Sequence, residues 1–133
     1  MAESSLIKKL GIKPRQKILI MNAPDGYMQT LGTLPEGAEV KTSAKGTSNF
    51  DCVQLFVYNK ADIDTHAMTV MQALKPRGLL WFAYPKKSSK VKTDITRDIG
   101  WEGLMSMGIR PVTLISIDDT WSALRFRPVS EVK

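Results

Sequence analysis

Cysteine and histidine are nearly missing from this chain of 133 residues, which contains one of each, Cys52 and His66. One cysteine forms neither an intrachain disulfide nor a cysteine-based zinc cage. No cysteine or carboxylate is arranged around His66 as in a known metal or nucleophile set, which argues against a metal site and against Ser-His catalysis. We therefore expect no metal, no catalytic residue of these kinds and a reducing, cytoplasmic setting.

Long apolar runs are also missing. The longest apolar stretches have the length of a strand, far below the roughly 20 residues that span a bilayer. The first residues, 1–12, contain two lysines and no apolar core of signal-peptide length. The sequence therefore predicts an unexported protein that does not bind membranes.

Glycine patterns that hold nucleotides are missing as well. A standard S-adenosylmethionine or dinucleotide site uses a Gly-rich turn after the first strand and an acidic residue after the second. Here the first turn has Gly26 alone, with Pro24 before it, and the second predicted strand is followed by Thr42, Ser43 and Lys45. No P-loop glycines precede Lys60 or Lys86. We expect no standard cofactor.

What the chain does contain is a strand-helix-strand pattern within 50–87. The runs Cys52–Tyr58 and Gly78–Tyr84 are almost continuously apolar, as in strands of a parallel sheet that is covered on both faces. Between them, apolar residues recur at the spacing of one helical face: Ile63, Ala67, Val70, Met71 and Leu74. A right-handed βαβ unit is the expected centre of one Rossmann-like α/β domain over 1–133.

Turn and cap residues divide the rest of the chain into further elements. We expect strands at 17–21, 38–42 and 112–117, helices at 27–31 and from Thr93 or Asp94 to Met107, and a loop at 43–49. The 112–117 strand and Trp121–Arg127 form an antiparallel hairpin in this interpretation. A helical arm at 1–13 and a frayed tail at 128–133 complete the prediction.

Basic residues dominate the charge, with a formal net charge of +6 and a pI near 9.6. They form two groups, which are Lys8, Lys9, Lys13, Arg15 and Lys17, and then Lys86, Lys87, Lys90, Lys92 and Arg97. Such groups gather phosphates, although charge runs are more often plain solvated surface. Nucleic-acid binding is therefore one alternative, with Tyr27 and Trp121 available to stack on bases.

A ligand site in an open parallel sheet lies outside the carboxyl ends of the strands. If the strand order is 2-1-3-4-6-5, several polar segments meet there. The residues that we expect to contact a ligand are Asn22, Asp25, Tyr27, Asn59, Lys60, Lys86, Lys87, Ser89, Arg97, Asp118 and Trp121.

The chemistry of this edge points to an anion. Lys86 and Lys87, with Ser88, Ser89 and Arg97, can hold a phosphate or carboxylate through charge-assisted hydrogen bonds. A structural alternative stays open, in which Asp118 or Asp119 pairs with these lysines and no ligand is needed. Trp121 fits packing better than stacking, and Tyr27 fits either role.

Several sequence words resemble known families. Phe50-Asp51-Cys52-Val53 and Leu74-Lys75-Pro76-Arg77-Gly78-Leu79-Leu80 are similar to landmarks of Rossmann-like methyltransferases. A second resemblance is to a family of short bacterial proteins that is catalogued as a domain of unknown function. It is carried by Leu10-Gly11-Ile12-Lys13-Pro14, Asn22-Ala23-Pro24, Gly26-Tyr27, Leu34-Pro35, Pro85-Lys86-Lys87, Asp94, Asp118 and Trp121-Ser122. This resemblance implies a bacterial, cytoplasmic protein and no particular activity.

The leading hypothesis is a non-catalytic module on a methyltransferase-like scaffold, which binds a small anion or a partner protein and has a regulatory role. Two alternatives are nucleic-acid binding and an atypical S-adenosylmethionine-dependent methyltransferase. A minimal enzyme that uses Asp118 with Lys86 or Lys87 as an acid-base pair ranks below them. The sequence does not indicate an oligomeric state.

Overall fold

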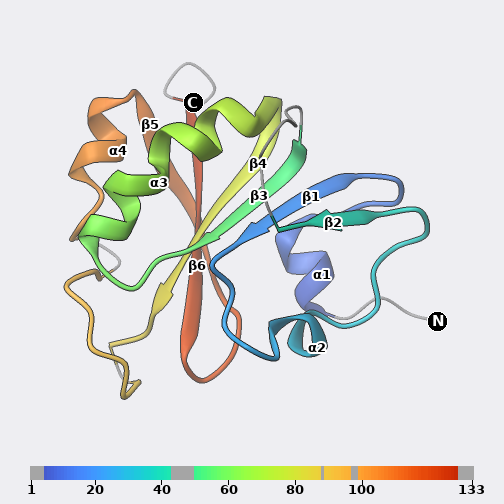
Figure 1. The fold of residues 1–133 in the computed structure, drawn as a ribbon, viewed down its shortest axis with the longest axis horizontal. Coiled ribbons are helices and arrows are strands. Elements are labelled where there is room, and N and C mark those ends of the chain that lie inside the picture. Colours follow the sequence, from blue (N-terminus) through green and yellow to red (C-terminus); the bar gives the residue numbers. More distant parts are fainter. Residues whose placement is uncertain (1–4, 43–49, 88, 97–98, 129–133) are drawn as a thin grey trace.

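The computed structural model describes residues 5–42, 50–87, 89–96 and 99–128 (Figure 1). The predicted loop at 43–49, Ser88, Arg97 and the tail beyond residue 128 lie outside this part. The helices are α1 (Ser5–Leu10), α2 (Tyr27–Leu31), α3 (Lys60–Ala73) and α4 (Glu102–Ser106). The strands are β1 (Lys17–Met21), β2 (Glu39–Lys41), β3 (Phe50–Phe56), β4 (Leu74–Pro85), β5 (Ile109–Ser116) and β6 (Trp121–Pro128).

The strands form one six-stranded sheet in the order β2-β1-β3-β4-β6-β5. The pairs β1–β2, β1–β3 and β3–β4 are parallel, whereas β6 runs antiparallel to both β4 and β5. The predicted order and the mostly parallel α/β sheet with its antiparallel C-terminal hairpin are confirmed. All parallel strands therefore end at one edge, which we call the carboxyl edge, and they begin at the other, the amino edge.

Helices pack on both faces of the sheet because the central strands are apolar on both faces. On one face, α3 and α4 cover a core that includes Val53, Phe82 and Phe126. On the other, α1 and α2 cover a core that includes Cys52, Trp81 and Ala123 (Figure 1). The βαβ prediction for the centre of the chain is thus confirmed.

The predicted helical arm appears as α1, and it is tied to the middle of the sheet. Leu6, Ile7 and Leu10 are buried, and the indole Nε1 of Trp81 donates a hydrogen bond to the carbonyl oxygen of Leu10 at 3.1 Å. Gly11 follows with φ +79°, in the left-handed region that favours glycine. The chain then turns away to reach β1.

The predicted helix from Thr93 or Asp94 to Met107 is wrong in its first half, because α4 begins only at Glu102. The Thr93 hydroxyl accepts a hydrogen bond from the Ile95 N–H, so a side chain satisfies a backbone donor that a helix would have used. Gly100, at φ +111°, then breaks the helical path. Ile95 and Trp101 are instead buried as single anchors.

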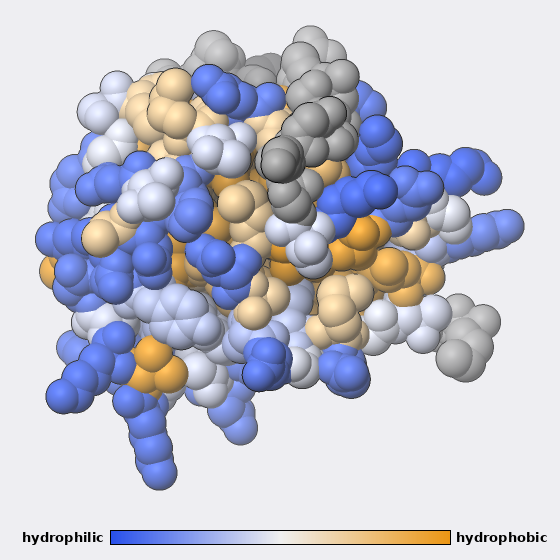
Figure 2. Space-filling model, in the orientation of Figure 1, coloured by the Kyte–Doolittle hydropathy of each residue, from blue (hydrophilic) through white to orange (hydrophobic). Residues whose placement is uncertain are grey.

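The surface seen in Figure 2 is mixed. Apolar residues gather over the region where β1 and β2 lie in Figure 1, and hydrophilic residues lie around them. In the described residues, no helix is long and apolar enough to cross a membrane.

Candidate functional site

The carboxyl edge brings together segments that are far apart in the sequence. Trp121 at the start of β6 pairs with Pro85 at the end of β4, and the Lys86 N–H donates to the carbonyl oxygen of Thr120 at 2.7 Å. Lys86 and the 118–120 turn therefore share this edge, as the sequence predicted. The segment after β4 and the β5–β6 turn both lie in the lower part of Figure 1.

The turn between β1 and α2 supplies the second part of the edge. Asn22 takes φ +60° and Gly26 takes φ +85°, so a non-glycine residue occupies a left-handed position at the start of this turn. Within the described residues, the backbone N–H groups of Ala23, Asp25 and Gly26 donate to no protein acceptor. Asp25 is exposed beside them. The turn therefore offers several free donors and one carboxylate.

Three aromatic side chains fill the interior directly beneath this edge. The Tyr27 and Phe56 ring centroids lie 4.6 Å apart, and those of Phe56 and Trp121 lie 5.1 Å apart, both in edge-to-face geometry. Tyr58 adds a fourth ring, 5.1 Å from Trp121. Tyr27 and Trp121 are 3% and 4% exposed, so both pack rather than face a ligand. Any ligand must lie above these rings.

The Tyr27 hydroxyl points inward rather than toward the edge. It donates a hydrogen bond of 2.5 Å to Oε1 of Gln54, a buried polar residue of β3. Burial, together with the nearby charges of Cys52 and Asp118, raises the pKa of Tyr27 above its ordinary value. The phenol is therefore a neutral structural donor at physiological pH.

The start of α3 forms the third part of the edge. The Asn59 side chain caps the helix by accepting a hydrogen bond from the Asp62 N–H at 3.0 Å. The Lys60 N–H donates to the Asp94 carboxylate at 2.8 Å, which ties this helix to the segment after β4. Asn59 thus shapes the edge, while the Lys60 side chain is exposed on it.

The basic segment after β4 is held mostly by hydroxyl and backbone contacts. Lys86 Nζ donates to Oγ of Ser116 at 2.6 Å, and Ser89 Oγ donates to the Lys86 carbonyl oxygen at 2.7 Å. Lys87 is exposed. Arg97 lies outside the described residues, so its place in the site is not assigned.

Asp118 serves the β5–β6 turn. Its Oδ1 accepts the N–H groups of Thr120 and Trp121, at 2.9 and 2.8 Å. Among the described residues, no ion pair joins Asp118 or Asp119 to Lys86 or Lys87. The alternative in which one of these aspartates pairs with the two lysines is therefore not what the structure shows.

Sequence reasoning missed Gln54, Phe56 and Ser116. Of these, only Gln54 could have been identified from the sequence, because a polar residue inside the apolar run Cys52–Tyr58 must find a hydrogen-bond partner when it is buried. Phe56 and Ser116 gave no such signal, because an apolar residue and an exposed hydroxyl are ordinary on strands.

The two basic groups lie at opposite edges of the sheet. Lys17 begins β1 at the amino edge, whereas Lys86 and Lys87 follow β4 at the carboxyl edge. Lys17 is thus separated from Lys86 and Lys87 by the length of the strands. Nucleic-acid binding through both groups at once stays a prediction that this placement does not favour.

Comparison with known proteins identifies the fold. No protein-family model and no curated protein matches the chain. Three solved structures align with 92% of it: DhpI in complex with SAH (13% identity, 80% of that chain, TM-score 0.61), a ribosomal protein L11 methylase from Lactobacillus delbrueckii subsp. bulgaricus (9%, 74%, 0.60) and a TehB-like SAM-dependent methyltransferase from Corynebacterium glutamicum (12%, 85%, 0.57). The chain therefore has a methyltransferase-like Rossmann fold. The predicted membership of a short bacterial family stays a prediction.

Proposed function

We propose that the carboxyl edge binds S-adenosylmethionine, as in an atypical S-adenosylmethionine-dependent methyltransferase. The observation that carries the proposal is the strand order, in which antiparallel β6 is inserted between β4 and β5. The aligned structures share this type of fold, and their names describe an SAH complex, a methylase and a SAM-dependent methyltransferase. This evidence favours cofactor binding over the purely non-catalytic module that leads the sequence hypotheses.

The residues of the first turn fit such a cofactor at its amino-acid end. The free N–H groups of Ala23, Asp25 and Gly26 can donate to its carboxylate. The Asp25 side chain can attract its ammonium or sulfonium group. The left-handed conformation at Asn22 and Gly26 takes over what a Gly-rich turn does in standard sites.

The fit is incomplete at the ribose. Pro24 offers no N–H. Lys41 at the end of β2 and Thr42, which follows it, carry no carboxylate for the ribose hydroxyls. We therefore expect weaker binding than in enzymes with the full set of contacts. When bound, the cofactor supplies an electrophilic methyl group.

The chain's own residues shape the space for that ligand, and the Tyr27 hydroxyl beneath it does not act as a base. Tyr27, Phe56 and Trp121 form an apolar base that excludes water from below the turn. The Tyr27 hydroxyl is committed to Gln54. The carboxyl edge therefore binds and orients the cofactor. The group that accepts the methyl belongs to a second substrate.

Titration calorimetry with S-adenosylmethionine and S-adenosylhomocysteine tests this proposal. We expect saturable binding of one molecule per chain, weakened by Asp25→Asn and unchanged by Glu39→Gln. Glu39 is a matched control because it is an exposed carboxylate that begins β2 at the amino edge. At 100 times the dissociation constant, the ligand should stabilise the fold by about 2.7 kcal/mol. Absence of both heat and thermal stabilisation with either compound would refute the proposal.

A second candidate is the anion-binding or regulatory module. It is favoured by Lys86, which donates to a hydroxyl rather than to a carboxylate, and by exposed Lys87 beside it. Phosphate or a dicarboxylate should then stabilise the protein, and Lys87→Ala should reduce that effect. Stabilisation by S-adenosylmethionine alone would instead favour the first candidate.

A further inference from the structure

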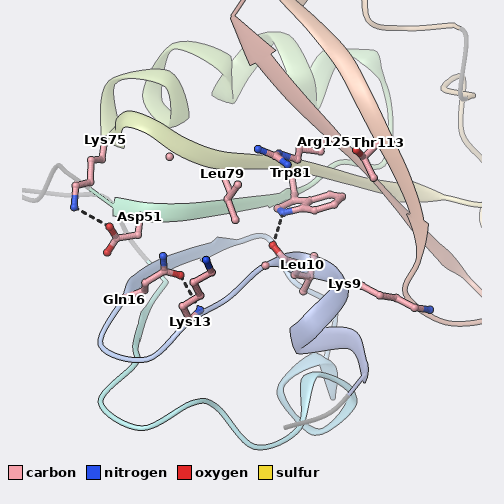
Figure 3. A pocket seen from close by; sticks show the side chains of 12 residues that line it. Lys9, Leu10, Lys13, Gln16, Asp51, Lys75, Leu79, Trp81, Thr113 and Arg125 are labelled. Carbon is pink, nitrogen blue, oxygen red and sulfur yellow. Dashed lines mark hydrogen bonds and ion pairs between the residues drawn. The ribbon is translucent and has the colours of Figure 1, made fainter. Parts of the chain in front are cut away.

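A cavity of about 400 Å³ lies at the amino edge, at the opposite end of the strands from the proposed cofactor site (Figure 3). It is bounded by the end of α1 and the segment that leads to β1 on one side, and by the α1-covered face of the sheet on the other. Its lining residues include Lys9, Lys13, Lys75, Arg125, Asp51 and Trp81. The volume lies within the range of small-molecule sites, about 300–1,000 Å³.

The walls of the cavity are fixed by packing and hydrogen bonds. The Trp81 indole donates to the Leu10 carbonyl oxygen, which holds the end of α1 against β4. The Lys13 N–H donates to Oε1 of Gln16 at 2.9 Å, which closes the short turn before β1. Leu10, Leu79 and Trp81 supply apolar surface between these polar groups (Figure 3). The end of α1 and the turn before β1 are therefore held beside the sheet by these contacts.

The charge of the lining is strongly unbalanced. Four of the lining side chains are cationic, namely Lys9, Lys13, Lys75 and Arg125, and the single carboxylate is Asp51. Both oxygens of that carboxylate are already used, since Oδ1 accepts from Lys75 Nζ and Oδ2 accepts from the Lys17 N–H, each at 2.9 Å. Lys9 and Lys13 thus have no carboxylate to meet within the cavity lining.

We propose that this cavity binds a small organic anion that joins an apolar ring to a phosphate or carboxylate group. The ring fits the apolar surface of Leu10, Leu79 and Trp81, and the anionic group fits the cationic side chains of the lining, of which Lys13 comes from the segment before β1 and Arg125 from the sheet (Figure 3). Such anions form charge-assisted hydrogen bonds with lysine and arginine, which neutral ligands do not. The site is independent of the carboxyl edge.

A matched set of probes tests this chemistry. 1-Naphthyl phosphate carries both the ring and the anion, 1-naphthol lacks the anion, and inorganic phosphate lacks the ring. Binding is followed by NMR at the three tryptophan indole N–H signals. The Trp81 indole borders the cavity. The Trp101 indole lies in the core on the other face of the sheet and donates to the Thr96 carbonyl oxygen, so its signal serves as an internal control.

We expect 1-naphthyl phosphate to shift the Trp81 signal saturably and to leave the Trp101 signal in place. The double variant Lys9→Ala/Lys13→Ala should weaken this binding about tenfold or more, because it removes two of the four cations of the lining. The control Lys8→Ala/Lys41→Ala removes the same charge outside the lining and should change the affinity less than twofold. 1-Naphthol and phosphate alone should bind at least tenfold more weakly.

Equal losses in both double variants would overturn the proposal, because they would indicate general attraction to a basic protein. Equal binding of 1-naphthol would overturn it too, because the cations would then have no role. A saturable shift at Trp121 with none at Trp81 would move the site to the carboxyl edge. None of these outcomes depends on whether S-adenosylmethionine binds.

Discussion

Replacing Tyr27 with phenylalanine tests how the base of the carboxyl edge is held together. The substitution removes the hydroxyl that donates to Gln54 Oε1 at 2.5 Å, between side chains that are 3% and 2% exposed. A buried acceptor left without its donor costs about 1–3 kcal/mol. In a domain of this size, each kcal/mol lowers the melting temperature by about 4 °C. The fold should survive, because a domain has about 5–15 kcal/mol of stability.

A double-mutant cycle with Gln54→Met isolates that hydrogen bond. Replacing both partners with apolar groups of similar shape is nearly neutral, so the double variant should be more stable than the sum of the single losses predicts, by about 1 kcal/mol or more. Urea unfolding of the four proteins measures this difference. Additive losses would show that the short contact contributes nothing specific, and they would refute our account of the edge.

The same pair predicts a dependence on alkaline pH. Burial first, and then the charges of Cys52 and Asp118, raise the folded-state pKa of Tyr27, whereas the unfolded value is about 10. Below the pKa of the unfolded state, the neutral phenol contributes its full stabilisation to the fold. This contribution is lost as pH rises toward the pKa of the folded state, because the phenol ionises more readily in the unfolded chain. The advantage of the natural protein over Tyr27→Phe should therefore shrink above about pH 10. Urea unfolding at a series of pH values measures it.

Three further predictions follow from other contacts. Although desolvation works in the opposite direction, hydrogen bonds from Lys75 and the Lys17 N–H hold the pKa of Asp51 below its ordinary value, so Asp51→Asn should lower stability by about 0.5–1 kcal/mol at neutral pH. That loss should vanish as pH falls through the folded pKa, and a constant loss down to strong acid would contradict it. Burial raises the pKa of the Cys52 thiol to about 12, so a thiol reagent at neutral pH should label only unfolded protein; prompt labelling of native protein would be incompatible with the buried position. Asn59→Ala should cost about 1 kcal/mol in urea unfolding through the lost cap of α3, and an unchanged midpoint would mean that the cap is replaced by water.

The sequence predicted the centre of the fold because burial there leaves a strong pattern. Two apolar runs on either side of a helical spacing have few solutions other than a covered parallel unit, and the topology then follows from the handedness of crossovers. The boundaries were less accurate. β4 begins at Leu74, directly after α3, although the residues before Gly78 are typical of a helix stop. Strand pairing with β3 decides that start, and pairing is not a local property of the sequence.

The segment 93–107 shows the opposite limit. Its polar start and its glycine stop have the pattern of a helix, yet hydrogen bonds within the segment compete successfully. Ile95 N–H is satisfied by the Thr93 hydroxyl, and the Trp101 indole reaches back to the Thr96 carbonyl oxygen. Tertiary burial of Ile95 and Trp101 then fixes the irregular path. Local propensity is a weak guide where two large apolar residues must both reach the core.

The two ends of the sheet explain why the candidate sites differ so much in how predictable they are. Residues of the carboxyl edge were predictable as a group, because parallel strands deliver their following loops to one place. The direction of each side chain was not, and Tyr27 turns inward because Gln54 offers a buried acceptor. The amino-edge cavity was not predicted at all, since its lining comes from α1, the residues before β1, β3, β4, β5 and β6. Its one sequence signal is Arg125, a cation between the buried apolar residues Leu124 and Phe126 of β6. The carboxyl edge and the cavity can therefore carry separate ligands on one small scaffold, and the two sets of variants proposed above separate them.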